Sequence, residues 1–123
     1  MFLLIRTSGQ RWVFPKGVVE DNEEPFRAAE REAFEEAGAS GHVNQIPLTR
    51  FKYHKHKFKS QGIYLEIDAY LLYVTRTQPS REPHRNPTWF SAEEAKSRLA
   101  EDREFWSAEE LRRVIDEAFA NIS

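Results

Sequence analysis

The feature that most constrains the fold is an alanine- and glutamate-rich segment at residues 24–37, which is followed by Gly38. Pro25 suits the first turn of a helix, and glycine is the residue that most often ends one. We therefore predict a helix over residues 24–37. At about 100° per residue, four of its apolar side chains form one stripe suited to a core. These four residues are Phe26, Ala29, Ala33 and Ala37.

Three glutamates of this helix lie on a face beside the apolar stripe. Glu32, Glu35 and Glu36 stand at positions i, i+3 and i+4, so their carboxylates converge. Each pair of like charges destabilises an isolated helix by roughly 0.2–0.5 kcal/mol. The helix dipole also disfavours anions near the C-terminal end. A hard divalent cation such as Mg²⁺ would offset both effects, whereas a solvated acidic face is the open alternative.

Four segments have the pattern of β-strands. Residues 2–6 and 12–14 are short apolar runs on either side of a turn. Residues 62–75 are rich in β-branched and aromatic side chains and predict one long strand. One face of that strand is predicted to be buried, and it comprises Ile63, Leu65, Ile67, Ala69 and Leu71. A short strand is predicted at residues 89–90, after a proline-rich loop over residues 78–87.

Two capping-box patterns predict further helices over residues 92–99 and 108–119. The patterns are Ser91 with Glu94 and Ser107 with Glu110. Strands and helices mix along the chain without strict alternation, so we predict an α+β fold with a mixed β-sheet sandwiched between helices (α/β/α). The length fits a single domain over residues 1–123.

The composition excludes several classes of protein. The chain has 123 residues, a formal net charge of -2 and a sequence pI near 6.1, which argues against a general nucleic-acid binder. The absence of cysteine excludes disulfides, thiolate chemistry and cysteine-based zinc sites. The apolar start is too short for a membrane span and lacks the features of a signal peptide. We therefore expect a cytoplasmic protein with no membrane partner.

The spacing around the acidic helix resembles the Nudix box. All invariant positions of that pattern are present, and they are Gly17, Glu23, Arg31, Glu32, Glu35, Glu36 and Gly38. The two aliphatic positions hold Ala33 and Ala39, which are smaller than the usual residues. Family members usually have another strand before residues 2–6, so either the start is trimmed or the first strand is absent. The resemblance otherwise covers roughly residues 2–120 and implies a Nudix-like fold.

The resemblance implies a metal-dependent enzyme that hydrolyses a phosphoanhydride bond, with Mg²⁺ or Mn²⁺ as its cofactor. The implied metal-binding and catalytic residues are Glu32, Glu35 and Glu36, with Gly17 adding its backbone carbonyl. The implied structural residues are Glu23, Arg31 and Gly38. In this family the proton acceptor is often Glu36 or a residue of a distant loop, for which Glu66 and Glu82 are the candidates.

A basic run at residues 51–59, FKYHKHKFK, predicts a site for phosphate groups. If it begins as a strand, Lys52, His54 and His56 share one face, and Tyr53, Lys55 and Lys57 share the other. The predicted substrate-binding residues are Lys16, Arg11, Lys52, His54, Lys55 and Lys57. The candidates for stacking on a base are Tyr53, Tyr64 and Tyr70. The alternative is a solvated loop that protects a hairpin edge.

The substrate predicted from this resemblance is a small molecule with a long phosphate array. The stretch from Trp12 to Gly17 is similar to two branches of the family: the diphosphoinositol polyphosphate hydrolases and the diadenosine tetraphosphate hydrolases. Two alternatives stay open, a non-catalytic sensor of polyphosphorylated ligands and an RNA 5′-end pyrophosphohydrolase. No nucleic-acid partner is favoured, and the chain is expected to be a monomer or a homodimer. His42 and His84 are predicted to be surface residues.

Overall fold

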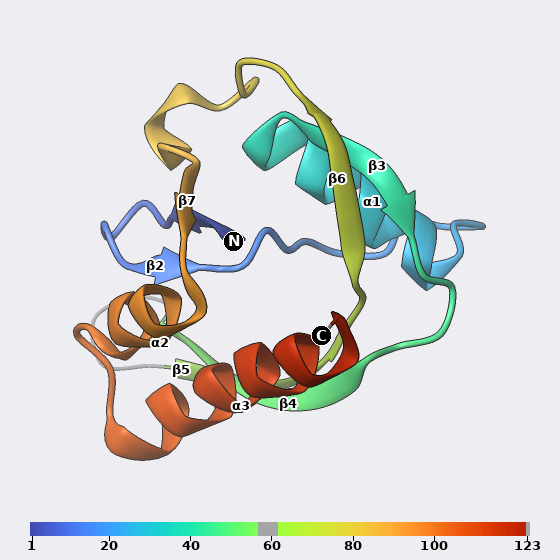
Figure 1. Ribbon diagram of the computed structural model, residues 1–123. Coiled ribbons are helices and arrows are strands. Elements are labelled where there is room, and N and C mark those ends of the chain that lie inside the picture. The colour runs from blue at the N-terminus through green and yellow to red at the C-terminus, as the bar shows by residue number, and fades with distance from the viewer. Residues whose placement is uncertain (57–61, 123) are drawn as a thin grey trace.

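The structure is a computed structural model that describes residues 1–56 and 62–122 (Figure 1). Its elements in chain order are β1 (Phe2–Arg6), β2 (Trp12–Val13), α1 (Pro25–Ala37), β3 (Ala39–Val43), β4 (Thr49–His56), β5 (Gly62–Ala69), β6 (Leu72–Thr77), the 3₁₀ turn η1 (Pro83–Arg85), β7 (Thr88–Phe90), α2 (Ala92–Ala100) and α3 (Phe105–Ile122). Helices and strands are mixed along the chain, which confirms the predicted α+β class.

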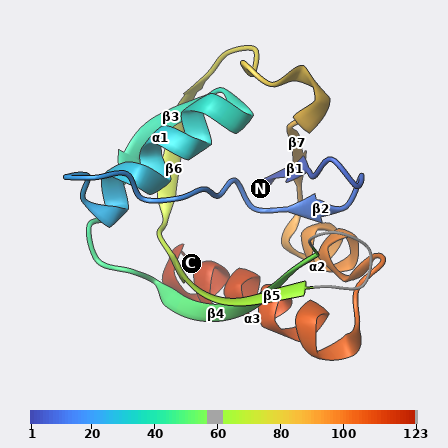
Figure 2. The ribbon, with the colours of Figure 1, turned by 180° about the vertical axis from the view of Figure 1, so that it is seen from behind.

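The strands pair in three small antiparallel sheets. These have the orders β2-β1-β7, β3-β6 and β4-β5. The first helix, α1, packs on β1 and β3, whereas α2 packs on β1, β2 and β7 (Figures 1 and 2). β1 therefore lies between helices, as the α/β/α prediction requires. The pairing differs in detail from that prediction, because the strands of the described ranges form separate antiparallel sheets and not one mixed sheet.

The predicted long strand over residues 62–75 is divided into β5 and β6 at residues 70–71. The division arises because the run changes partner: β5 pairs with β4, and β6 pairs with β3. The amide of Leu48 donates to the carbonyl of Ala69 at 2.7 Å, and the amide of Asn44 donates to the carbonyl of Leu71 at 2.9 Å. The sequence prediction also missed β3, which carries the exposed His42.

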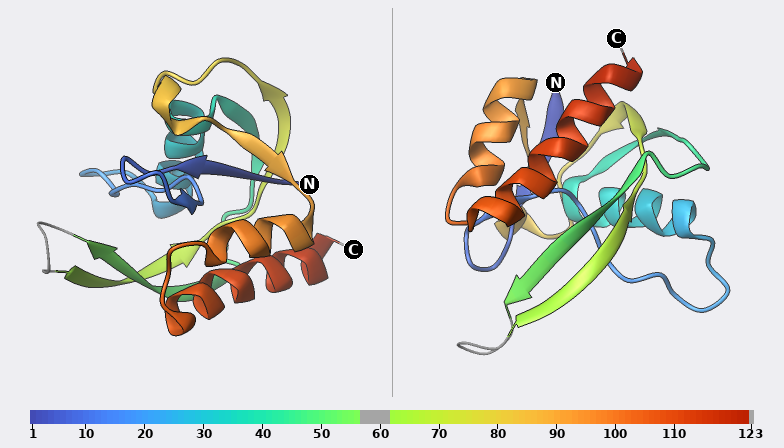
Figure 3. Two further views of the ribbon diagram at one scale, coloured as in Figure 1. Left: turned by 90° about the vertical axis from the view of Figure 1, so that its left-hand side faces the viewer. Right: turned by 90° about the horizontal axis from the view of Figure 1, so that it is seen from below.

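The predicted buried face of residues 62–75 is only partly correct. Ile67 and Ala69 are half-buried and pack against the core, whereas Ile63 and Leu65 are exposed. The hairpin of β4 and β5 extends away from the rest of the fold, so its far end has no layer to bury these side chains (Figure 3). Alternation along a strand identifies a face, but only packing decides whether that face meets a core.

The helices agree with the sequence at two of three starts. α1 follows Glu24 and ends at Gly38, close to the predicted bounds. The Ser91 hydroxyl accepts a hydrogen bond from the amide of Glu94 at 3.2 Å, which confirms the cap of α2. The capping prediction for Ser107 is wrong, because α3 begins at Phe105 and Ser107 is a buried residue inside it. None of the helices in the described ranges is long and apolar enough to cross a membrane.

The main hydrophobic core joins the sheets to α2 and α3. Its largest fully buried side chains are Leu4, Ile5, Val13, Leu99, Leu111 and Ile115. Phe51 and Tyr53 of β4 also belong to it, and their rings pack edge to face with centroids 6.4 Å apart. The segment that leads into α1 also packs on this core, because the Phe14 ring meets the Phe51 ring of β4 edge to face with centroids 6.0 Å apart.

Candidate functional site

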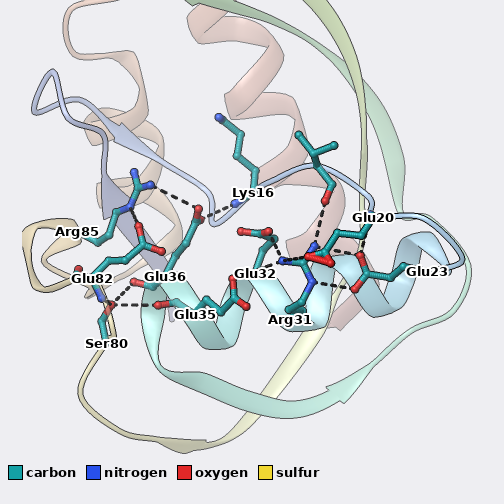
Figure 4. A network of polar contacts seen from close by, with 11 residues as sticks. Lys16, Glu20, Glu23, Arg31, Glu32, Glu35, Glu36, Ser80, Glu82 and Arg85 are labelled. Carbon is teal, nitrogen blue, oxygen red and sulfur yellow. Dashed lines mark hydrogen bonds and ion pairs between the residues drawn. The ribbon is translucent and has the colours of Figure 1, made fainter.

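Three carboxylates of α1, those of Glu32, Glu35 and Glu36, divide between two arginine-centred clusters (Figure 4). Arg31 lies in one cluster, toward the start of the helix, with Glu23, Glu32 and Glu35. Arg85 lies in the other, beyond the helix end, with Glu36 and Glu82. Because Glu32, Glu35 and Glu36 come from little more than one turn of α1, the two clusters are neighbours on the same helix face.

Arg31 holds Glu23 through two hydrogen bonds. Its Nε donates to Glu23 Oε2 at 2.8 Å, and its Nη2 donates to Glu23 Oε1 at 3.0 Å. Such bidentate pairs are among the stronger interactions between charged side chains. The guanidinium lowers the pKa of the Glu23 carboxyl, and Glu23 in turn raises the pKa of Arg31. Arg31 Nη2 also donates to the backbone carbonyl of Val18 at 3.0 Å, so this pair ties the preceding loop to α1.

The same guanidinium also contacts two glutamates of the helix. Arg31 Nη1 donates to Glu32 Oε1 at 2.6 Å and to Glu35 Oε2 at 3.4 Å. These contacts relieve the repulsion between carboxylates that the spacing i, i+3 implies. The positive charge that the sequence reasoning assigned to a metal ion is therefore supplied in part by Arg31.

The Glu32 carboxylate lies directly against the backbone of Gly17. A Cβ atom at position 17 would collide with the Glu32 carboxyl carbon and with its Oε1. Glycine is therefore the one residue that leaves this carboxylate where it is, because any other side chain would occupy its position. This contact brings together two residues of the motif that are 15 positions apart in the sequence.

Glu36 is a buried carboxylate, with only 6% of its surface exposed. Its Oε1 accepts a hydrogen bond from the backbone amide of Lys16 at 2.9 Å, and its Oε2 lies 3.6 Å from Arg85 Nη2. Burial raises the pKa of Glu36 to about 7. The Lys16 amide and Arg85 oppose that rise, whereas the nearby negative charges of Glu32 and Glu82 add to it.

The loop after β6 supplies residues that sequence reasoning missed. Arg85 Nε donates to Glu82 Oε1 at 3.0 Å, so Arg85 lies between Glu82 and Glu36. The Ser80 hydroxyl donates to the carbonyl of Glu36 at 2.7 Å. The only sequence signal for this arrangement is the opposite charge of Glu82 and Arg85 at spacing i, i+3 across Pro83. Of the two predicted distant glutamates, Glu82 lies in this cluster, whereas Glu66 pairs with Arg50 at 3.7 Å on the β4–β5 hairpin.

The helix offers the kind of donors that a hard divalent ion prefers. Glu32, Glu35 and Glu36 present carboxylate oxygens, and Glu32 is seated on the backbone of Gly17. Within residues 1–56 and 62–122, no three acidic or histidine side chains are grouped closely enough to hold an ion as they stand. The donor set fits a divalent ion chemically, but Glu32 and Glu35 would have to exchange contacts with Arg31 for contacts with that ion.

The described part of the basic run, residues 51–56, lies on β4. Phe51 and Tyr53 point inward, while Lys52 and Lys55 are exposed and His54 is half-buried. The amide of Lys52 donates to Glu110 Oε1 of α3 at 2.7 Å. Lys57 lies outside the described residues, as does the His56 side chain.

The three stacking candidates differ in exposure. Tyr53 is 3% exposed, so it packs in the core and is not available for a base. Lys16 Nζ lies 4.8 Å from the centre of its ring, which connects the loop before α1 to β4. Tyr70 is half-buried, and burial raises the pKa of its hydroxyl. Tyr64 is 71% exposed and stacks on His54 with ring centres 4.5 Å apart.

Arg11 and His54 meet at a second position, near the start of α3. They line a small pocket of about 60 Å³, whose other lining residues are Asp102, Arg103, Glu104, Trp106 and Ser107. Arg11 Nη1 donates to the carbonyl of Asp102 at 3.2 Å. The predicted phosphate-binding residues are therefore divided: the Lys16 side chain lies over the Tyr53 ring, Arg11 and His54 line the small pocket, and Lys52 and Lys55 are exposed on β4. His84 is exposed on η1, as predicted.

Comparisons with known proteins identify the motif. The family model described as the NUDIX domain matches residues 1–114. "Diphosphoinositol polyphosphate phosphohydrolase 3-beta" of Bos taurus is 35% identical over 89 residues, which are 69% of this chain and 50% of that protein. "Nudix hydrolase 12, mitochondrial" of Arabidopsis thaliana is 56% identical over 36 residues, which are 29% of this chain and 18% of that protein. The matched region thus spans half of the length of the first relative and less than a fifth of the length of the second.

A solved structure shares the fold. The crystal structure of an Ap4A hydrolase binary complex from C. elegans has a TM-score of 0.64 with this chain. The similarity covers 98% of this chain and 85% of the other, at 23% sequence identity. At that identity, the similarity describes the arrangement of helices and strands and says nothing of the ligand.

Proposed function

Because this chain belongs to the NUDIX domain family, we propose that it hydrolyses a phosphoanhydride bond with the help of a divalent metal ion. The observation that carries the proposal is the Glu32 carboxylate seated on the backbone of Gly17, next to the buried carboxylate of Glu36. Both glutamates belong to the complete motif, and carboxylate oxygens are the ligands that a hard divalent ion prefers.

The proposed metal-holding residues are Glu32, Glu35 and Glu36, with the carbonyl of Gly17, and Mg²⁺ or Mn²⁺ is the proposed ion. A divalent ion at such a site neutralises phosphate charge and lowers the pKa of a bound water. Arg31 and Glu23 fix the loop before the helix, so Gly17 stays beside Glu32. Glu36 and Glu82 are the proposed acceptors of the proton from water, because Arg85 holds both carboxylates in one cluster.

The proposed substrate has a long phosphate array, as in diphosphoinositol polyphosphates or dinucleoside polyphosphates. The backbone amide of Lys16 contacts Glu36, while its side chain extends over the Tyr53 ring, so its ammonium group would contact phosphates on the β4 side of the carboxylates. Lys52, Lys55 and the group around Arg11 and His54 would contact more distant phosphates. The exposed Tyr64 is the remaining candidate for stacking on a base, which would favour a dinucleotide over an inositol compound.

The test is a panel of substrates with Mg²⁺ and with Mn²⁺, including a diphosphoinositol polyphosphate, a dinucleoside polyphosphate, ADP-ribose and a nucleoside triphosphate. Glu35→Gln and Glu36→Gln should each lower kcat by about 100-fold or more, because each removes a charged oxygen donor. Glu93→Gln is the matched control, since Glu93 is an exposed glutamate of α2 with 88% of its side chain accessible.

Two results would overturn the proposal. Wild-type rates in both glutamate variants would show that the helix does not carry the chemistry. Tight binding of a polyphosphate without turnover under either metal would show a binding module in place of an enzyme. Hydrolysis restricted to RNA 5′ ends, with strongly salt-dependent binding, would move the substrate to nucleic acid.

A further inference from the structure

The loop that follows β6 contacts both the main chain and the side chain of Glu36. Ser80, at the start of this loop, contacts the Glu36 carbonyl, and Arg85, at its end, contacts the Glu36 carboxylate. Glu36 is the last residue but one of α1, where a helix lacks partners for its carbonyl groups. The contacts therefore act on a residue that the helix alone holds weakly.

Ser80 is a polar connection at the C-terminal end of α1. Its hydroxyl donates to the Glu36 carbonyl at 2.7 Å and accepts from the amide of Glu82 at 2.9 Å. Its side chain thus links the amide of Glu82 in the loop to the carbonyl of Glu36 at the end of the helix. Since the same loop carries Arg85, this connection fixes the position from which the guanidinium reaches Glu36 (Figure 4).

Arg85 uses each of its three nitrogens on an acceptor of this protein. Nε donates to Glu82 Oε1 at 3.0 Å, Nη2 lies 3.6 Å from Glu36 Oε2, and Nη1 donates to the carbonyl of Arg6 at 3.4 Å. Only 22% of its side chain is exposed. With most of its side chain buried and each nitrogen beside a protein oxygen, this guanidinium is better placed to hold carboxylates than to bind a phosphate group.

We propose that Ser80 and Arg85 are positioning residues that orient the Glu36 carboxylate and keep Glu82 beside it. This inference rests on the proposed function, in which Glu36 holds the metal ion and receives a proton. Residues that orient metal ligands through hydrogen bonds commonly affect metal affinity and activity without touching the metal. Arg85 is suited to this role because its planar fork can contact two carboxylates at once, which a lysine cannot do.

The experiment compares Arg85→Ala, Arg85→Lys and Ser80→Ala with the wild type. We expect Arg85→Ala to lower kcat by about 10- to 100-fold while KM changes by less than about twofold. The affinity for Mn²⁺, measured by calorimetry without substrate, should weaken by about 10-fold. Arg85→Lys should recover part of both losses, and Ser80→Ala should cause a smaller loss of kcat than Arg85→Ala.

Arg81→Ala is the matched control, because Arg81 belongs to the same loop but lies over the Phe34 ring, 5.1 Å from its centre. This control should keep the wild-type kcat and Mn²⁺ affinity. Circular dichroism at the assay temperature establishes that each variant is folded. In the Glu36→Gln background, Arg85→Ala should lower kcat by less than about twofold further, because the two residues act together.

Three outcomes would overturn the inference. One is a folded Arg85→Ala variant with wild-type kcat and Mn²⁺ affinity. Another is a raised KM with unchanged kcat, which would make Arg85 a substrate contact. The third is full additivity with Glu36→Gln. The proposed function fails separately, since its failure would appear in the wild type as neither Mn²⁺ binding nor hydrolysis.

Discussion

Replacing Gly17 with alanine should reduce activity much more than stability. The added methyl group would occupy the place of the Glu32 carboxylate, so that carboxylate has to move. The movement is energetically inexpensive because the displaced atoms are the far end of a flexible side chain, not the backbone. Gly17 also has a backbone conformation that other residues adopt, because its φ lies outside the left-handed region.

The expected loss of stability follows from the contacts of Glu32. Moving its carboxylate breaks the 2.6 Å hydrogen bond from Arg31 Nη1, while Arg31 keeps both bonds to Glu23. Breaking one partly exposed, charge-assisted bond costs about 1 kcal/mol. For a domain of this length, that corresponds to a fall in Tm of roughly 4 °C. Activity should fall by roughly 10- to 100-fold, since a proposed metal ligand is displaced.

Gly38→Ala is the matched comparison for this prediction. Gly38 has φ +67 and ends α1, and a Cβ there would collide with the backbone carbonyl oxygen of Gln78. Neither the left-handed conformation nor that carbonyl can adjust easily, so we expect a loss of roughly 2–4 kcal/mol. Thermal unfolding by circular dichroism and kcat for the best substrate measure both variants. The reasoning is refuted if Gly17→Ala lowers Tm as much as Gly38→Ala does, or if it keeps full activity.

Three further variants test residues outside the carboxylate clusters. The hydrogen bond from the Lys52 amide lowers the pKa of the Glu110 carboxyl in the folded protein. The charged carboxylate therefore stabilises the fold at a pH above the pKa that Glu110 has in the unfolded chain. This stabilisation is lost as the pH falls through the pKa that Glu110 has in the folded protein. Glu110→Gln should therefore lower Tm at pH 7, and this loss should shrink when the melts are repeated at successively lower pH; a loss that stays the same at every pH would count against this linkage. Lys16→Ala should raise KM for every substrate, because it removes an ammonium group that is proposed to contact the phosphates from its position over the Tyr53 ring. Lys55→Ala should raise KM only for substrates with long phosphate arrays, and equal effects of Lys55→Ala on ADP-ribose and on a diphosphoinositol polyphosphate would contradict its role.

Local sequence determined the elements whose signals lie within a few residues. The bounds of α1 followed from Pro25, the alanine-rich stripe and Gly38, because helix starts, faces and ends are set by neighbours in sequence. The Ser91 cap followed for the same reason, whereas the similar pattern at Ser107 failed because packing extended α3 past it. The family also followed from the sequence, since the motif is a set of residue types at fixed spacing.

Only the tertiary structure decided which charges meet. The sequence placed Arg31 and three glutamates on one helix but did not show that Arg85, which follows tens of residues later, reaches Glu36. The distance between two such residues depends on how the sheets and loops pack. The same reason explains the division of residues 62–75 into β5 and β6, because strand partners are chosen by the whole fold. Sequence alone thus determined the chemical groups on α1, and the fold determined their neighbours, their burial and therefore their charge environment.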